Sequence, residues 1–478
     1  MTGNSAKLRH WAAQPKGESW HGVASTLQQL TVLLVLGVVI GVVIFRVGIM
    51  PLTAIAAAIV MSWIAYRFPV AVTLSLTLVI LTSQLFQMLN LLPEGWDILG
   101  GGIRASDFVL VGMWGASAAL ILRRTRQSRD EGLIIVASLV LVGLLVVAVT
   151  RNWGAYGLSA LGEFRFRYLI LGLPVYLALS LRSARSRIQL ATLFAWAPVV
   201  GVLAVLPLAG ALRGWALDEA SRFYPSAISL ALLFGAIWFG LTEHYPHKVE
   251  RVWVKYGALL LVSLIVVKDA HRSVWLVAGV SLALLILLRV IKVGRLWSWG
   301  LIALAGSIVV ISVLGLLGSD PIGYVATRGT AFLRPADDPT TYWRLATWKA
   351  YGASILRSPL LGQGFGGYWD VYVPEMGARI TISPHSVYVQ TLVKLGFLGM
   401  AAILAWFGFA ARALLRASER ASSAAGRSRM MTVMGLIGVV GSLAYGTVYA
   451  LDFWALGWIG VGLASALHSE EAEVLCGE

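Results

Sequence analysis

The sequence predicts an all-α, polytopic membrane protein, and three observations support this fold class. Of its 478 residues, 58% are hydrophobic and 13% are charged, against roughly 45–50% and about 25% in an ordinary soluble domain. Long apolar runs recur along the chain, and basic residues gather in alternate connections between them. A soluble fold is excluded, because so little charge could not cover the surface of so apolar a chain.

The apolar runs give the order of the predicted helices. A helix that spans the hydrocarbon core needs about 20 mostly apolar residues. The candidate runs are 27–45, 49–66, 70–90, 105–122, 132–149, 166–181, 189–211, 223–242, 253–267, 272–290, 298–318, 386–409, 430–448 and 452–467. Only a few residues separate 253–267 from 272–290, so we expect 12–14 spans.

These runs divide the chain into five predicted parts. They are a cytoplasmic tail (1–26), transmembrane helices 1–11 (27–318), a large periplasmic loop (319–385), transmembrane helices 12–14 (386–467) and a second cytoplasmic tail (468–478).

Basic residues predict the orientation of the spans. The formal charge is 38 − 23 = +15, and Lys and Arg concentrate in cytoplasmic connections of membrane proteins. With both termini inside, every second connection is rich in arginine, as after the spans that end near 122 and 409. This bias accounts for most of the positive charge, so we expect a lipid bilayer and no nucleic acid as partner.

The long connection 319–385 contains two features of its own. Leu345, Trp348, Tyr351, Ile355 and Leu356 recur at helical spacing within 341–356, and Arg344 and Lys349 are predicted on other faces. This pattern predicts an interfacial helix. The glycine-rich stretch 361–368 that follows is better suited to a close backbone turn than to a regular element.

One histidine stands out once the predicted orientation is applied. Five of the seven histidines fall on the cytoplasmic side, which leaves His271 and His385 outside. His385 follows Pro384 where the long loop returns to the membrane. An imidazole at this place could serve as a base or as a hydrogen-bond donor near neutral pH. The alternative is an interfacial histidine without a chemical task.

No motif predicts a metal or a cofactor. The pair His244-x-x-His247 with Glu243 lies in a short loop without a third ligand, so a solvated loop is the better interpretation. Asp-x-Asp does not occur, which disfavours a metal-dependent nucleotide-sugar transferase. The glycines near 364 lack the lysine of a phosphate-binding loop. The single cysteine, Cys476, forms no internal disulfide.

Several arginines lie on the predicted outer side, against the orientation bias. They include Arg151, Arg213, Arg222 and Arg272, and Lys268 lies close to the last of these. Guanidinium groups bind phosphate oxygens in bidentate fashion. Some of these residues could simply anchor lipid head groups. The more specific hypothesis is that they converge on one phosphate or pyrophosphate at the outer leaflet.

Four stretches of the chain resemble the bacterial O-antigen ligase and O-antigen polymerase superfamily. The resemblance rests on Arg344-x-x-x-Trp348, on Ser358-Pro359-Leu360-Leu361-Gly362-Gln363-Gly364-Phe365-Gly366, on Pro384-His385-Ser386-Val387-Tyr388 and on Lys394-Leu395-Gly396-Phe397-Leu398-Gly399. Two weaker matches lie upstream. His271-Arg272-Ser273 is similar to the family's arginine at the head of a span. In Arg222-Phe223-Tyr224-Pro225-Ser226, Ser226 stands where the family has asparagine.

The resemblance implies a GT-C-like, metal-independent, inverting glycosyltransferase in the bacterial inner (cytoplasmic) membrane, with its active site facing the periplasm. The implied donor is a glycan on undecaprenyl pyrophosphate, and the acceptor is a sugar hydroxyl of a glycan or of lipid A core. The implied catalytic residues are His385, Arg272 and Arg222. Further substrate-binding residues would be Arg213, Arg344, Lys268 and Arg151. Between Arg222 and Arg213 as the upstream arginine, we favour Arg222.

Several functions stay open on the sequence alone. A polysaccharide polymerase, an O-antigen ligase and a transferase to protein would share the donor and differ in the acceptor. The alternative from another class is a polysaccharide or lipid transporter or flippase, which would place ionisable residues at the middle of its spans. Here most of them lie at helix ends, and Lys394 is the main exception. A structural subunit of an envelope complex would not need His385 or the arginines.

Overall fold

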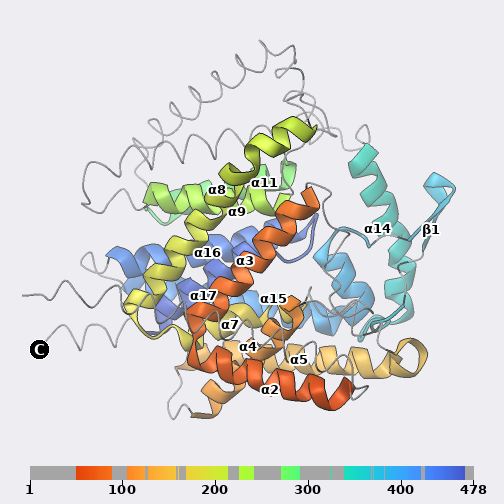
Figure 1. Ribbon diagram of the computed structural model, residues 1–478. Coiled ribbons are helices and arrows are strands. Elements are labelled where there is room, and N and C mark those ends of the chain that lie inside the picture. The colour runs from red at the N-terminus through yellow and green to blue at the C-terminus, as the bar shows by residue number, and fades with distance from the viewer. Residues whose placement is uncertain are drawn as a thin grey trace, which may run out of the picture. The chain divides into compact units, whose positions relative to one another are not determined.

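The computed structural model (Figure 1) describes part of the chain. The described residues are 50–88, 105–123, 128–157, 168–213, 226–241, 271–290, 339–367, 371–381, 383–420 and 426–468, with the single residues 160, 323 and 369. The chain divides into two units, residues 1–60 and 61–478. Of the first unit only the beginning of helix α2 (Met50–Arg67) is described.

The described part of the second unit is almost entirely helical, which confirms the predicted all-α class. Its helices are α3 (Pro69–Met88), α4 (Ala105–Arg123), α5 (Arg129–Tyr156), α7 (Gly172–Ser180), α8 (Ala184–Arg213), α9 (Ser226–Leu241), α11 (Arg272–Leu287), α14 (Pro339–Arg357), α15 (Val387–Arg420), α16 (Gly426–Gly446) and α17 (Phe453–Leu467). Strands β1 (Val371–Val373) and β2 (Ala378–Ile380) form an antiparallel hairpin around the 3₁₀ turn Pro374–Met376.

Five of the described helices are long and apolar enough to cross a membrane, and a sixth is added if a bent pair counts as one span. The bent pair is α2 with α3, whose axes differ by 116° at the break between Arg67 and Pro69. The chain is therefore a polytopic membrane protein. The predicted spans 27–45, 253–267 and 298–318 lie outside the described residues, so the total of 12–14 and the five-part division stay predictions.

Two predicted spans differ from the helices that form. Within the described part of the run 166–181, a turn at Ile170 and Leu171 interrupts the helix, and α7 ends where Leu181 leaves the helical conformation. The run 386–409 becomes α15, which extends to Arg420 and is broken at Gly396, where φ is 66°. An L-residue with a side chain adopts such a φ only at a cost, so glycine marks the break.

Hydrogen bonds show which end of α5 lies beside which end of α15. At one end Asp130, at the start of α5, accepts hydrogen bonds from Arg416 near the end of α15. At the other end Ala148 and Asn152 of α5 contact the loop that precedes α15. Helices α5 and α15 thus run antiparallel, as the predicted alternation of connections requires.

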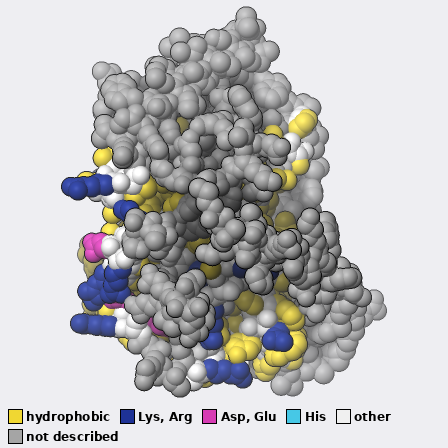
Figure 2. All heavy atoms as spheres, turned by 90° about the vertical axis from the view of Figure 1, so that its left-hand side faces the viewer, with side chains coloured by type: hydrophobic (Ala, Val, Ile, Leu, Met, Phe, Trp, Pro, Cys, Tyr) yellow, Lys and Arg dark blue, Asp and Glu magenta, His cyan; other side chains and the backbone are white. Residues whose placement is uncertain are grey.

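The first of these ends, which we call the basic end, also includes the start of α16, where Arg429 donates to Leu288 at the end of α11. Figure 2, which faces the left-hand side of Figure 1, shows Lys and Arg side chains gathered beside hydrophobic ones there. The opposite end, which includes the starts of α9, α11, α15 and α17, we call the site end.

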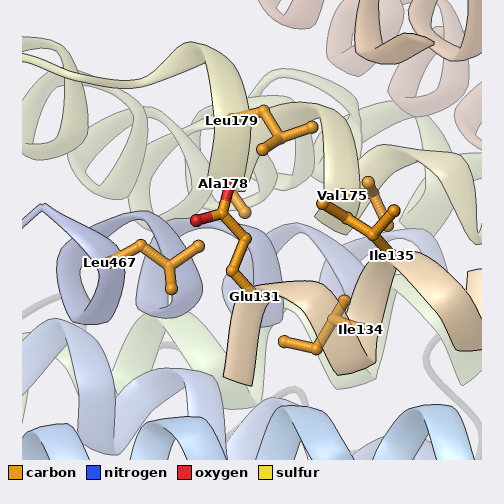
Figure 3. A pocket seen from close by; sticks show the side chains of 7 residues that line it. All are labelled: Glu131, Ile134, Ile135, Val175, Ala178, Leu179 and Leu467. Carbon is orange, nitrogen blue, oxygen red and sulfur yellow. The ribbon is translucent and has the colours of Figure 1, made fainter. Parts of the chain in front are cut away.

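A small cavity near the basic end is lined almost entirely by apolar side chains. Its lining residues come from α5, α7 and the end of α17: Glu131, Ile134, Ile135, Val175, Ala178, Leu179 and Leu467. Figure 3 shows the carboxylate of Glu131 pointing between α7 and α17. Because Glu131 is in the first turn of α5, this cavity lies at the opposite end from His385 and is not the candidate site.

Candidate functional site

His385 occupies a constrained turn between the hairpin and α15. Its φ is +48°, in the left-handed region that a residue with a Cβ adopts only where its surroundings impose it. The indole Nε1 of Trp348 donates a 2.6 Å hydrogen bond to the carbonyl oxygen of Pro384. On the other side, the amide of Val387 donates to the carbonyl oxygen of Tyr449 at 2.9 Å. The backbone is therefore held both before and after His385.

Two aromatic rings flank the imidazole, which is half-buried. The ring of Trp343 lies 5.5 Å away between centroids with an interplanar angle of 64°, and the ring of Tyr449 lies 6.5 Å away at 88°. Both contacts are edge-to-face, a favourable arrangement for aromatic pairs. The imidazole keeps a defined orientation while part of it stays accessible to a substrate.

Arg344 also contacts Tyr449. Its guanidinium carbon is 5.4 Å from the centre of the Tyr449 ring, within the range of a cation–π interaction. Its Nε is buried and has no hydrogen-bond partner among the described residues. The guanidinium thus places a positive charge against the Tyr449 ring that also contacts His385, and within the described residues its Nε has no acceptor.

Arg272 is the first residue of α11 and reaches the same helix as Arg344. Its Nη1 donates to the hydroxyl of Thr341 at 3.4 Å. Thr341, Arg344 and Trp348 are spaced i, i+3 and i+7, which places them on one face of α14. This face, which we call the site face of α14, contacts Arg272, Tyr449 and Pro384 in turn.

The predicted apolar face of α14 differs from the observed one. Leu345 and Leu356 are exposed, whereas Tyr351 is buried and Trp348 half-buried. Arg344 shares the face of Trp348, because the two residues are four apart. The sequence pattern predicts Arg344 on another face, but the helix turns its cation toward the protein.

A hydrogen bond joins the start of α9 to this site. The hydroxyls of Ser226 and Tyr445 are 2.6 Å apart, and both side chains are buried. The ring of Tyr445 stacks on that of Tyr449, with 4.9 Å between centroids and an interplanar angle of 22°. Arg222, four residues before Ser226, lies outside the described residues.

The remaining predicted site residues have different positions. Arg151 donates to the carbonyl oxygen of Gly362 at 2.9 Å, so it contacts the glycine-rich loop. Arg213 is the last residue of α8, and only its helical backbone is described. Lys268 lies outside the described residues. Binding of substrate by these three residues stays a prediction, as do the catalytic roles of His385, Arg272 and Arg222.

Lys394 is the ionisable residue predicted inside a span. Its Nζ donates to the carbonyl oxygen of Gly367 at 2.9 Å and lies 4.5 Å from the centre of the Trp369 ring. The side chain is 3% exposed. It joins the first part of α15 to the end of the glycine-rich loop.

Lys349 and Glu375 of the long loop are solvated. Lys349 and Glu375 form an exposed ion pair of 2.6 Å between α14 and the hairpin. The hydrogen bond to Lys349 holds the pKa of Glu375 below its usual value, and the same bond raises the pKa of Lys349. Among the described residues, no three His, Cys, Asp or Glu side chains come together in a way that could hold a metal ion.

Residues 257–404 match the model of the family described as O-antigen ligase. This stretch of the chain is thus similar to the O-antigen ligase family. The matched stretch includes Arg272, Arg344 and His385, and it confirms the resemblance at the level of the superfamily. No curated protein shows a match to the chain.

Three aromatic residues of the site were not singled out from the sequence: Trp343, Tyr445 and Tyr449. Trp343 lies inside the matched stretch 257–404 and the two tyrosines lie beyond it. The i, i+4 spacing of Tyr445 and Tyr449 at the end of an apolar run was the only available signal. Such spacing is common in core positions, so it carries little information about a site.

Proposed function

We propose that this protein is a metal-independent, inverting glycosyltransferase that transfers a glycan from an undecaprenyl-pyrophosphate-linked donor to an acceptor sugar hydroxyl. We place the reaction at the periplasmic face of the bacterial cytoplasmic membrane, in the assembly of lipopolysaccharide or exopolysaccharide. The observation that supports the proposal best is the site face of α14. It links Arg272, Arg344 and the His385 turn, which come from three separate parts of the chain.

In this proposal the arginines act on the leaving group. The acceptor oxygen forms a bond to C1 of the donor sugar while the bond from C1 to the diphosphate oxygen breaks, so negative charge grows on the diphosphate. Guanidinium groups stabilise that charge through paired hydrogen bonds. Arg272 and Arg344 are the described candidates, and Arg222 joins them on sequence grounds. A diphosphate stabilised in this way needs no general acid.

His385 acts on the acceptor. A neutral imidazole accepts the proton of the attacking hydroxyl, and it orients that hydroxyl even when proton transfer follows bond formation. The flanking rings of Trp343 and Tyr449 keep the imidazole in one orientation. We propose that the donor lipid reaches the site from between helices and the acceptor glycan from the side of the long loop.

Deletion of the gene in the source cell, followed by gel analysis of glycans, tests the proposal. A polymerase leaves single repeat units and no distribution of chain lengths. A ligase leaves full-length polymer on its lipid carrier. An unchanged glycan pattern contradicts the proposal. Addition of a chelator to the purified enzyme with donor and acceptor tests metal independence, because activity that is lost and then restored by a divalent ion contradicts it.

A further inference from the structure

The glycine-rich loop completes the hydrogen bonding of the broken helix α15. At Gly396 the helical ladder is interrupted, which leaves backbone groups on both sides without helical partners. The loop supplies them through four bonds: Gln363 N to Val393 O (2.7 Å), Gly364 N to Lys394 O (3.0 Å), Phe397 N to Pro359 O (2.7 Å) and Leu398 N to Leu360 O (3.1 Å).

Close backbone approach makes this docking possible. Gly362, Gly364 and Gly366 all have positive φ. A Cβ on Gly364 would lie 2.8 Å from the carbonyl oxygen of Ala148, and a Cβ on Gly366 would meet the ring of Tyr156. Residues 358–367 therefore pack closely against α5 and α15.

The break lies at membrane depth. Arg412 and Arg416 pair with Asp130 at the basic end. Gly396 is 16 residues before Arg412, a rise of about 24 Å along a helix. The hydrocarbon core is about 30 Å thick. With Arg412 at one boundary, Gly396 lies inside the opposite boundary, and any tilt of α15 moves it deeper.

Helix α5 gives an independent measure of the same depth. Phe365 donates its amide to the carbonyl oxygen of Ala148. Trp153 and Tyr156, further along α5, are exposed aromatic residues of the kind that gather at the membrane–water interface. Ala148 lies five residues before Trp153, or about 8 Å deeper along the helix. The loop thus reaches below the level of these aromatic side chains.

An exposed apolar patch surrounds the docked loop. Its members are Leu356 (78% exposed), Leu360 (63%), Leu361 (39%), Phe397 (53%) and Leu398 (47%). The last two belong to α15, one of the helices that can cross a membrane. The patch therefore continues the surface of a helix that can cross a membrane, and in water it would cost hydrophobic free energy.

We infer that residues 356–361 re-enter the bilayer from the long loop and contact the acyl chains of the outer leaflet. A broken helix is tolerated at membrane depth only where its backbone groups are satisfied by protein, and the loop provides that satisfaction. The long loop thus has a water-exposed part, the hairpin, and a part embedded in lipid. This inference depends on the membrane fold and not on the proposed chemistry.

Single-cysteine labelling tests the inference. Cys476 is the one cysteine of the chain, so Cys476→Ser gives a background for Leu360→Cys. Tyr372→Cys on the exposed hairpin is the water control, and Leu139→Cys on the exposed surface of α5 is the lipid control. Each variant is labelled with an environment-sensitive fluorophore and reconstituted in liposomes of phosphatidylethanolamine and phosphatidylglycerol.

Two quenchers distinguish the environments: iodide in water, and a nitroxide near the head-group end of a lipid acyl chain. We expect the probe at 360 to be quenched severalfold more by the nitroxide than by iodide, as at 139, and the probe at 372 to show the reverse. Iodide quenching at 360 equal to that at 372 overturns the inference. Protection from both quenchers also overturns it, since it means that protein covers the patch. Leu356→Cys, measured in the same way, provides a second position should Leu360→Cys fail to fold.

Discussion

Trp348 and Pro384 are 36 residues apart in the chain and are joined by a 2.6 Å hydrogen bond from the indole Nε1 to the carbonyl oxygen. This bond holds the peptide unit that precedes His385 while the left-handed backbone of His385 turns the chain into α15. The position of the imidazole thus depends on Trp348, which lies on the site face of α14.

Replacing Trp348 with phenylalanine should lower transfer activity about tenfold while the protein still folds. Phenylalanine keeps an aromatic ring but lacks the indole N–H donor. A misplaced catalytic group raises the activation free energy, and a tenfold loss in rate corresponds to about 1.4 kcal/mol. The measurement is the initial rate of glycan transfer. Trp153→Phe, at the exposed end of α5, is the matched control, and equal rates in both variants would contradict the role of Trp348.

Ser226 and Tyr445 should be energetically coupled. Removing either hydroxyl leaves the other buried without its partner, which typically costs about 1–3 kcal/mol. Ser226→Ala and Tyr445→Phe should therefore each lower thermal stability in detergent. The double variant should lose less than the sum of the two losses. Ser226→Thr keeps the hydroxyl and should stay close to the parent protein, and strict additivity of the single variants would argue against the bond.

Gly364→Ala should sharply reduce the amount of folded protein. The left-handed φ costs a residue with a Cβ roughly 1–2 kcal/mol, and the new Cβ would also press on the Ala148 carbonyl. Gly377→Ala in the hairpin has a similar φ and open space around it, so it should show the conformational cost alone. The comparison uses melting temperature and the monodisperse fraction in detergent, and equal losses would mean that the docking contact is unimportant.

Arg344→Lys should raise the KM for the lipid-linked donor more than it lowers kcat. Lysine keeps the charge but lacks the planar fork that stacks on Tyr449 and pairs with two phosphate oxygens. Arg344→Met, which loses the charge as well, should have a still higher KM for the donor. If both variants have the same KM for the donor as the parent protein, the guanidinium of Arg344 does not bind the donor.

The sequence predicts the parts of this protein that depend on local patterns. Apolar runs locate α3, α4, α8, α9, α11, α16 and α17 because lipid demands continuous hydrophobic helices. The motif around His385 and the arginine at the head of α11 are visible because their order in the chain is itself the signal. Both lie within residues 257–404, the stretch that matches the O-antigen ligase family.

Tertiary contacts decide the features that the sequence does not reveal. The break at Gly396 is hidden inside an apolar run, because the hydrogen bonds that compensate for it come from residues 359–364. The orientation of Arg344 follows from what α14 packs against. Tyr449 becomes part of the site only because α16 ends beside the start of α15.

The initial rate of glycan transfer by His385→Ala is the most direct test of the central claim. Purified protein is supplied with lipid-linked donor and acceptor, and His244→Ala, in a loop predicted on the opposite side of the membrane, is the control. General-base catalysis contributes about 10²–10⁴-fold. We therefore expect His385→Ala to lose at least about 100-fold in rate with unchanged melting temperature, and the control to be fully active. A His385→Ala protein that transfers glycan at the parent rate would contradict the account.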